Sequence, residues 1–252
     1  MLDFCIGETE KRICDIHGEY ESSHFKYKAI DHWSCCPECA AIEGKRKAAE
    51  EKRQQLDEWR KQAIANSGIG DRCLGKTLDD YVADTDAKRE VLEYCREYSS
   101  RFVDFLGRGS GIVLLGSVGT GKTHLAAGII QSVIMGGHSA KYTSVSRMIR
   151  RIRATYAKGS EESEQNAIQF FIRPDLLVID EIGVQRGSEY ESDMLFDIVN
   201  ERYEALKPMI LIANLTIQEM RQAVGDRVYD RMRENGGRAF VMDWKSHRGN
   251  KS

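Results

Sequence analysis

The chain has 252 residues, of which 41% are hydrophobic and 30% are charged, and its formal net charge is −2. This length predicts one large or two modest domains, and the hydrophobic share suffices for a real core. A charge so close to zero excludes attraction of the whole protein to nucleic acid, so any such contact must be a local patch. The sequence has no apolar run long enough to span a membrane and no secretory signal at its start, so we expect a cytoplasmic protein.

The N-terminal region contains two pairs of metal-binding residues. Cys14 and His17 form the first pair, Cys36 and Cys39 form the second, and two residues separate the members of each pair. Such pairs suit a tetrahedral Zn²⁺ site, and clustered cysteines in a reducing compartment favour a metal over disulfides. The role would be structural, because four protein ligands leave no open position for catalysis. Cys35 competes with Cys36, although its spacing to Cys39 is less usual, and the alternative is a set of free thiols beside a chance histidine.

We therefore expect residues 1–45 to form a zinc-binding module. Four aromatic residues between the ligand pairs are candidates for a very small core: Tyr20, Phe25, Tyr27 and Trp33. A domain of this size would need the metal for its stability.

Residues 46–69 are predicted to be a helical connector. The stretch from Ala40 to Ala65 is rich in Ala, Glu, Lys, Arg and Gln and has few apolar positions, which is typical of an exposed helix. The simpler interpretation is a solvated linker, and the alternative is a helix that binds a partner protein through Leu56 and Trp59. Further along the chain, residues 90–106 are predicted to form a second, amphipathic helix.

Residues 70–252 are predicted to be an α/β domain with a five-stranded, mostly parallel sheet. Five strand-like runs alternate with helical stretches: Ile112–Leu115, Lys141–Ser144, Leu176–Asp180, Met209–Ala213 and Ala239–Met242. This alternation is typical of a parallel sheet that is covered by helices. Ligands of such sheets bind at the carboxyl ends of the strands, so polar residues at those ends are candidate site residues.

The turn after the first of these strands matches the phosphate-loop pattern G-x-x-x-x-G-K-[ST]. Its residues are Gly116, Ser117, Val118, Gly119, Thr120, Gly121, Lys122 and Thr123, and a strand and a helix flank them as the motif requires. Glycines allow several backbone N–H groups to point at one anion. Lys122 would contact the β- and γ-phosphates of ATP, and the Thr123 hydroxyl would bind Mg²⁺.

Three polar residues end two of the other predicted strands. Asp180 and Glu181 follow one apolar run, and Asn214 follows another. Asp180 suits Mg²⁺, and Glu181 suits the base that orients and activates the attacking water. Asn214 would hold that water near the γ-phosphate; the alternative is a strand-terminal asparagine in a turn.

One dense basic stretch follows the second predicted strand. It contains Arg147, Arg150, Arg151 and Arg153, and Tyr156 comes shortly after them. Positive charge beside an aromatic ring suits a contact with single-stranded DNA, in which the arginines bind the backbone and the ring stacks on a base. The alternative is a solvated basic face of a helix.

Taken together, these motifs resemble the AAA+ proteins of the DnaC type, which load the replicative DNA helicase. Related families are the IstB-type transposition helpers and the DnaA-type initiators. The resemblance covers about residues 65 to 250 and rests on these motifs: Gly-Thr-Gly-Lys-Thr-His-Leu-Ala, the Ile-Asp-Glu strand end, Ile182-Gly-Val-Gln185, Asn214, Arg-Val-x-Asp-Arg-Met-Arg at 227–233, and the terminal Trp-x-Ser-x-Arg. It implies an AAA+ P-loop fold, and since few residues follow the last strand, we expect no C-terminal helical lid.

The resemblance also implies roles for single residues. Asn214 would be the sensor-1 residue and Arg248 the sensor-2 residue. Arg231 would be the arginine finger that is supplied to the ATP of a neighbouring subunit, with Arg227 and Arg233 as rivals. A finger that acts on a neighbour implies a homo-oligomer, in an open ring or a spiral.

Two further implications concern partners. The family places a DNA-facing helix at the basic stretch, and we expect Ser188 and Tyr190 to lie on the same side. The N-terminal region of such loaders contacts the helicase, so the zinc module and the connector would recognise it.

We therefore expect an ATP-dependent loader that places the replicative helicase on single-stranded DNA in a bacterial, phage or prophage system. ATP, Mg²⁺ and Zn²⁺ would be its ligands. One alternative is a transposition helper ATPase that acts on duplex DNA with a transposase; the zinc module argues against it. Another is a nucleotide-dependent adaptor that does not hydrolyse ATP; Glu181 and Asn214 argue against that.

Overall fold

The computed structural model describes residues 5–27, 30–183 and 189–246, and it divides the chain into two compact units. The first unit is Met1–Trp59 and the second is Arg60–Ser252. The boundary falls inside one long helix, α1 (Pro37–Ala65). Among the described residues, no helix is both long and apolar enough to cross a membrane.

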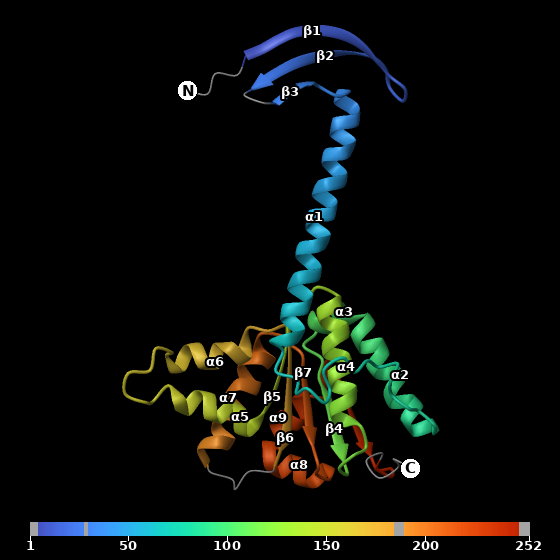
Figure 1. The fold of residues 1–252 in the computed structure, drawn as a ribbon. Coiled ribbons are helices and arrows are strands. Elements are labelled where there is room, and N and C mark those ends of the chain that lie inside the picture. Colours follow the sequence, from blue (N-terminus) through green and yellow to red (C-terminus); the bar gives the residue numbers. More distant parts are fainter. Residues whose placement is uncertain (1–4, 28–29, 184–188, 247–252) are drawn as a thin grey trace. The chain divides into compact units, whose positions relative to one another are not determined.

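The first unit begins with an antiparallel sheet of three strands in sequence order: β1 (Cys5–Cys14), β2 (Gly18–Tyr27) and β3 (Ile30–Trp33) (Figure 1). A tight turn joins β1 to β2, and Gly18 has a φ of 83°, which favours glycine at this position.

The predicted aromatic core of the first unit is not found. Tyr20, Phe25 and Trp33 stay partly exposed, and in the part of this unit that the structure describes only Ser22 and Cys36 are buried. A single small sheet has no second layer to cover its face, so its aromatic rings cannot be enclosed. The Trp33 ring instead lies 4.5 Å from the Arg12 guanidinium and 4.9 Å from the His24 ring.

Helix α1 starts three residues earlier than the sequence predicts, because Pro37 occupies its first position. Proline is favoured there, since its missing N–H would have no partner inside the helix. None of the residues of α1 is buried. Ion pairs along its exposed surface, such as Arg46 with Glu43 and Arg53 with Glu50, each at 2.8 Å, support the helix instead.

The second unit contains the predicted five-stranded parallel sheet. Its order is β5-β6-β7-β4-β8. The strands are β4 (Ile112–Gly116), β5 (Ala140–Ser144), β6 (Leu176–Ile182), β7 (Met209–Ala213) and β8 (Arg238–Met242). The sequence therefore predicted the number, the location and the parallel pairing of these strands correctly.

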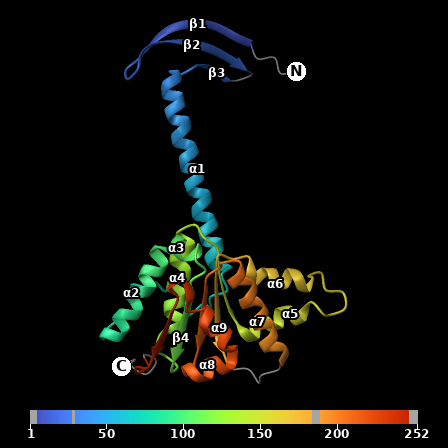
Figure 2. The same ribbon diagram turned by 180° about the vertical axis from the view of Figure 1, so that it is seen from behind.

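Helices cover both faces of this sheet. They are α2 (Asp86–Ser100), α3 (Phe102–Leu106), α4 (Lys122–Met135), α5 (Val145–Ala154), α6 (Glu164–Ile172), α7 (Glu189–Glu204), α8 (Ile217–Val224), α9 (Asp226–Arg231) and the short 3₁₀ helix η1 (Glu234–Gly236). In both ribbon views α5 and α6 lie together on one side of the unit, and α2 and α3 lie on the other (Figures 1 and 2). Within the described residues no helix follows β8.

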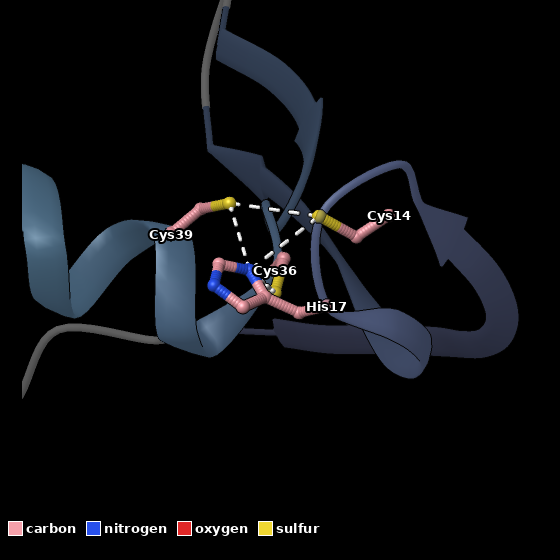
Figure 3. A group of neighbouring side chains, drawn as sticks. All are labelled: Cys14, His17, Cys36 and Cys39. Carbon is pink, nitrogen blue, oxygen red and sulfur yellow. Dashed lines mark hydrogen bonds between the residues drawn. The ribbon is translucent and has the colours of Figure 1, made fainter.

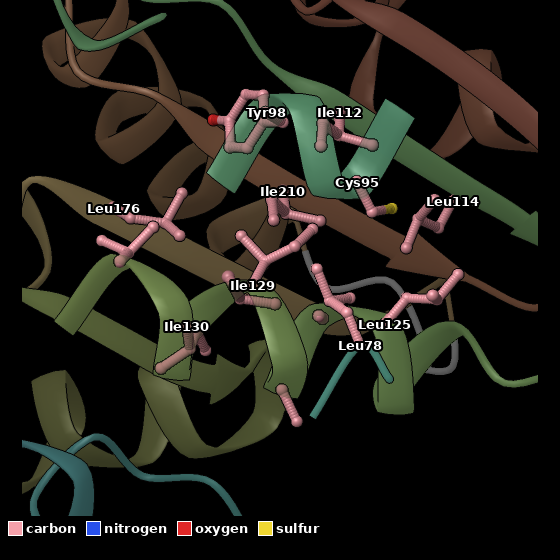
Figure 4. Close-up of a cluster of buried hydrophobic side chains, with 14 of the residues drawn as sticks. Leu78, Cys95, Tyr98, Ile112, Leu114, Leu125, Ile129, Ile130, Leu176 and Ile210 are labelled. Carbon is pink, nitrogen blue, oxygen red and sulfur yellow. The ribbon is translucent and has the colours of Figure 1, made fainter. Parts of the chain in front are cut away.

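Strand β4 shows how the two cores form. Its side chains alternate, so Ile112 and Leu114 join one core with α2, α3 and α4, while Val113 and Leu115 join the other with α5 to α9. Figure 4 shows the first of these cores, in which Leu125 and Ile129 of α4 pack against the sheet.

The predicted helix over residues 90–106 is in fact two helices. Arg101 leaves the helical conformation, with φ −109° and ψ 29°, and separates α2 from α3. Ser99 and Ser100 precede it, and both hydroxyls donate to carbonyls of the preceding turn. Such side-chain hydrogen bonds compete with the backbone hydrogen bonds of the helix and favour its termination here.

Candidate functional site

The phosphate loop lies between the end of β4 and the start of α4, and two of its glycines are required by their positive φ angles and by close neighbours. Gly116 has a φ of 123°, and a Cβ there would lie 2.3 Å from the Met242 carbonyl oxygen. Gly121 has a φ of 97°, and a Cβ there would lie 2.5 Å from the Tyr81 ring. No other residue type fits either position without displacing its neighbours.

Two side chains from distant parts of the chain hold the loop in place. The Thr120 carbonyl accepts hydrogen bonds from the Tyr81 hydroxyl at 3.2 Å and from the Trp244 indole N–H at 2.9 Å. The sequence analysis assigned neither residue to the site, although Trp244 belongs to the terminal motif. The buried Lys122 Nζ donates to the carbonyls of Gly116 and Ser117 at 2.8 and 2.7 Å, so its charge lies at the loop.

The carboxylate of Asp180 is buried and held on both of its oxygens. Oδ2 accepts hydrogen bonds from the Thr123 hydroxyl at 3.0 Å and from the Tyr142 hydroxyl at 2.6 Å, and Oδ1 accepts one from the Glu181 N–H at 2.6 Å. Burial and the adjacent Asp180 charge raise the pKa of Tyr142, which keeps its hydroxyl protonated as a donor. The structure thus brings together Thr123 and Asp180, the two predicted magnesium ligands.

Glu181 has an unusual backbone. Its φ is 60°, and the register of β6 against β7 shifts between Ile179 and Ile182. A left-handed conformation costs free energy for a residue other than glycine, and such strain is typical of functional sites. The exposed Glu181 side chain lines the same cavity as the phosphate loop.

That cavity has a volume of about 410 Å³, within the range of small-molecule sites. Eight predicted residues line it: Val118, Gly119, Gly121, Lys122, Thr123, Asp180, Glu181 and Asn214. Cys73 and His124 line it as well, and neither was predicted to be a site residue, although His124 belongs to the family motif that begins in the phosphate loop. His124 Nε2 lies 2.9 Å from the Thr77 carbonyl oxygen, which fixes its ring beside the loop.

The three candidate finger arginines lie outside the cavity of their own chain. Arg231 donates to the Asn200 side chain, and its guanidinium lies 4.3 Å from the Tyr203 ring on α7. Arg233 lies 5.8 Å from the Tyr229 ring, and Arg227 is exposed. Arg248, the predicted sensor-2 residue, lies outside the described residues.

The predicted basic helix exists as α5, and its two faces differ in chemistry. Val145, Met148, Ile149 and Ile152 are buried, while Arg147, Arg150 and Arg153 are exposed. Acidic neighbours balance part of the charge, because Arg151 pairs with Glu162 at 2.6 Å and Arg153 with Glu191 at 3.5 Å.

Two other predicted DNA contacts follow this helix. The Tyr156 hydroxyl lies 2.8 Å from that of Tyr190, so these two residues are on the same side, and Tyr156 also donates to Glu164. Ser188 lies outside the described residues. For Arg150, which is exposed, the described part of the chain offers no hydrogen bond or ion pair, so its charge is not balanced by a neighbour there.

The four predicted zinc ligands converge in the first unit (Figure 3). Cys14 ends β1, His17 lies in the turn between β1 and β2, Cys36 precedes α1, and Cys39 lies in the first turn of α1. The Cys14 and Cys39 sulfurs are 3.6 Å apart, and His17 Nδ1 lies 3.3–3.7 Å from the three sulfurs. A tetrahedral zinc ion with its usual bond lengths holds two sulfurs about 3.8 Å apart and a sulfur and a nitrogen about 3.6 Å apart. The observed distances therefore fit that ion.

The surroundings of the cluster favour the same interpretation. Backbone N–H groups of Ile16 and His17 lower the pKa of Cys14 to about 6, so its sulfur is prepared as a thiolate. The hydrogen bond with Cys14 raises the pKa of Cys39 to about 11, so a second thiolate needs a nearby cation. His17 Nε2 faces Glu38 Oε2 at 3.5 Å, as metal-bound histidines face an outer carboxylate. Cys36 is buried and Cys35 is exposed, so the structure places Cys36 in the cluster.

Comparisons with known proteins agree with the fold and the phosphate loop of the second unit. The family model of the IstB-like ATP-binding protein matches residues 74–232. The replicative helicase loader DnaC of Buchnera aphidicola subsp. Acyrthosiphon pisum (strain APS) is 30% identical over 185 residues, which are 73% of this chain and 74% of that protein. The uncharacterized protein YdaV of Escherichia coli (strain K12) is 28% identical over 250 residues, 99% of this chain and 97% of that protein. The crystal structure of the DnaC helicase loader has the same fold, with a TM-score of 0.61 and 22% identity over 68% of this chain and 99% of that chain.

Proposed function

The chain belongs to the IstB-like ATP-binding family and is a homologue of the DnaC-type helicase loaders, and from this premise we propose that it loads the replicative helicase onto single-stranded DNA at the expense of ATP. One observation carries the proposal. The phosphate loop, Asp180, Glu181 and Asn214 line a single cavity of nucleotide size in a chain of this family.

Five side chains of the cavity have a task in the proposed hydrolysis of ATP. Lys122 would neutralise charge on the β- and γ-phosphates, and Thr123 and Asp180 would hold Mg²⁺, whose charge would stabilise the transferring group. The Glu181 carboxylate orients a water for attack and accepts its proton, and the Asn214 amide fixes that water without adding charge. Hydrolysis then acts as a switch that releases the loader.

A single substitution tests this mechanism. Glu181→Gln keeps the shape of the side chain and removes the base, so we expect ATP hydrolysis to fall about 10²- to 10³-fold while ATP still binds. Glu93→Gln, on the exposed surface of α2, serves as the matched control. Unchanged turnover in Glu181→Gln would exclude this role, and a wild-type protein that binds ATP without hydrolysing it would favour a nucleotide-dependent adaptor.

The finger residue is proposed to act between subunits. Arg231, the last residue of α9, packs against α7 and does not line the cavity of its own chain, as is expected of a residue that serves a neighbouring ATP. Arg231→Ala and Glu181→Gln proteins are each expected to be inactive, and mixing them should restore part of the hydrolysis, because some interfaces then contain both intact residues. The same test is made with Arg227→Ala and Arg233→Ala, each mixed with Glu181→Gln. If one of these mixtures regains hydrolysis and the Arg231→Ala mixture does not, that other arginine is the finger.

Helix α5 is proposed to contact single-stranded DNA. Arg150→Ala should weaken oligonucleotide binding. The number of counterions released on binding, which the salt dependence measures, should fall by about one, because one phosphate contact is lost. The measurement is a salt titration of binding with the full chain. An unchanged affinity and slope would leave α5 as a solvated basic face.

The first unit is proposed to hold one zinc ion and to contact the helicase. A transposition helper is the second candidate, because the matching family model also describes IstB-like proteins. Loading of the helicase onto single-stranded circles in the presence of this protein and ATP supports the first candidate. Failure to load it, together with capture of a transposase on duplex DNA, supports the second.

A further inference from the structure

Tyr142 joins three parts of the second unit that the proposed mechanism treats separately. Its hydroxyl contacts the Asp180 carboxylate at 2.6 Å, its ring lies 5.3 Å from the Arg147 guanidinium of α5, and its backbone N–H donates to the Ser67 carbonyl at 2.6 Å. We propose that Tyr142 is a positioning residue that orients Asp180 in the nucleotide site and links that carboxylate to Arg147. This inference rests on the proposed ATPase function of the cavity.

The register of the sheet brings Tyr142 to Asp180. Tyr142 of β5 pairs with Val178 of β6, and Asp180 lies two residues further on the same face of that strand. A diagonal neighbour of this kind is within reach of a long aromatic side chain. The Tyr142 hydroxyl therefore contacts Asp180 as a consequence of strand pairing, without any loop that must first become ordered.

The hydroxyl approaches Asp180 from the protein side. Tyr142 is not among the residues that line the cavity, whereas Thr123 and Asp180 are. With Tyr142 and the Glu181 N–H bound to its two oxygens, the carboxylate has one preferred orientation. Hydrogen bonds to a charged group are among the stronger ones, so removing this hydroxyl should reduce the share of carboxylates that are ready to bind a cation.

The position of Tyr142 is itself fixed by the start of the second unit. Gly68 has a φ of 87°, and a Cβ there would lie 2.3 Å from the Tyr142 carbonyl oxygen, so this segment lies directly on β5. Arg147 covers the Tyr142 ring and donates to the Gly68 carbonyl at 3.1 Å. Gly68, Arg147, Tyr142 and Asp180 thus form one continuous set of contacts.

This set of contacts connects the basic helix to the nucleotide site. Arg147 is exposed, and a DNA phosphate that binds its guanidinium competes with the Gly68 carbonyl and with the Tyr142 ring. The change reaches Asp180 through a single side chain. DNA on α5 should therefore alter the Mg²⁺ requirement of ATP binding, and Tyr142 should be needed for that effect.

The direct test uses Tyr142→Phe in the full chain, which keeps the ring and removes only the hydroxyl. A fluorescent ATP analogue is titrated at a series of Mg²⁺ concentrations, with and without a short oligothymidine. We expect the Mg²⁺ concentration for half-maximal binding of the analogue to rise about three- to tenfold. Binding in the absence of Mg²⁺ should not change, and the oligonucleotide should no longer alter the Mg²⁺ requirement. Tyr94→Phe, which loses a 2.9 Å hydrogen bond to the Gly236 carbonyl far from the site, is the matched control and should behave as the wild type.

The outcomes separate the two proposals. If Tyr142→Phe shows the wild-type Mg²⁺ dependence while the wild type binds and hydrolyses ATP, the positioning role is wrong and the proposed function stands. If the wild type itself shows no Mg²⁺-dependent binding of ATP, both are wrong. An equal change in binding without Mg²⁺ would indicate a merely structural role and would also overturn the inference.

A double-mutant cycle tests the link to α5. Arg147→Met removes the guanidinium and keeps much of the side-chain length, and it should raise the Mg²⁺ requirement by less than Tyr142→Phe does. The double variant should match Tyr142→Phe alone, because both changes break the same set of contacts. Fully additive effects would contradict the link.

Discussion

The two units of this chain are stabilised in different ways. In the described part of the first unit only Ser22 and Cys36 are buried, and α1 has no buried residue. The second unit encloses a core on each face of its sheet, with side chains such as Ile129 and Leu211 fully buried. We therefore expect the stability of the first unit to depend on a metal ion at the Cys/His cluster and on surface ion pairs, and that of the second unit to depend on apolar burial.

This difference matches the proposed division of tasks. A nucleotide site needs residues that are held within a fraction of an ångström, and a dense core supplies that rigidity to Asp180 and the phosphate loop. A module held by one metal ion needs few buried residues, so its surface is available for a partner protein. Ile13 and Ile16, beside the ligands Cys14 and His17, are 77% and 79% exposed.

Loss of the metal should have the largest effect, and it should be confined to the first unit. Structural zinc supplies about 10–16 kcal/mol to small zinc domains, so Cys36→Ser should unfold β1 to β3 while the second unit still binds ATP. Amide hydrogen exchange, followed separately for each unit, measures this unfolding. Metal analysis of the wild type should find about one zinc ion per chain. Cys35→Ser is the matched control and should retain both. Slow exchange in β1 to β3 of metal-free protein would contradict the role of the metal.

A pair of identical substitutions should separate the two units next. Ile129→Ala removes a fully buried side chain of the second unit and should lower its free energy of unfolding by about 2–5 kcal/mol. Ile42→Ala removes a side chain of α1 that is 58% exposed and should change stability by less than about 0.5 kcal/mol. Urea denaturation measures both values, and comparable losses would show that α1 has a covered apolar face.

The smallest effect should come from the ion pairs of α1. The Arg53 guanidinium lowers the pKa of Glu50 below its usual value of 4.5. The ion pair therefore stabilises the helix fully above that pH, and this stabilisation is lost as the pH falls through the lowered pKa. Glu50→Gln should therefore reduce helicity slightly at neutral pH and low salt. The difference should vanish in high salt, and circular dichroism measures it. A difference that persists in high salt would indicate a role other than charge.

The sequence was sufficient to predict features whose signals are local. Strands β4, β6 and β7 contain continuous apolar runs, and the phosphate loop and the cysteine pairs have fixed spacings, so short windows of sequence carry these signals. The break at Arg101 was not predicted, because apolar residues continue on both sides of it with helical spacing.

Residues that act through distant contacts could not be predicted in this way. Tyr142, Tyr81 and Trp244 reach the site only once strands and loops are paired. In the sequence Tyr142 and Tyr81 are ordinary aromatic residues, and Trp244 belongs to the terminal motif without a role of its own. Arg202 is a stronger example. It is fully buried, and it donates to the carbonyls of Phe171, Ile172, Pro174, Asp175 and Pro208. Its sequence context on a charged helix predicts an exposed residue, because the carbonyls that bind it come from other segments.

The most direct test of the account is capture of the cognate replicative helicase by the full chain in the presence of ATP, compared among the wild type, Cys36→Ser and Glu181→Gln. The account predicts that the wild type and Glu181→Gln capture the helicase and that Cys36→Ser, which lacks a folded first unit, does not. Loading of the captured helicase onto DNA and release of the loader should occur with the wild type and stall with Glu181→Gln. Equal capture by Cys36→Ser, or no capture by the wild type, would contradict the claim that the first unit, stabilised by its metal ion, recognises the helicase.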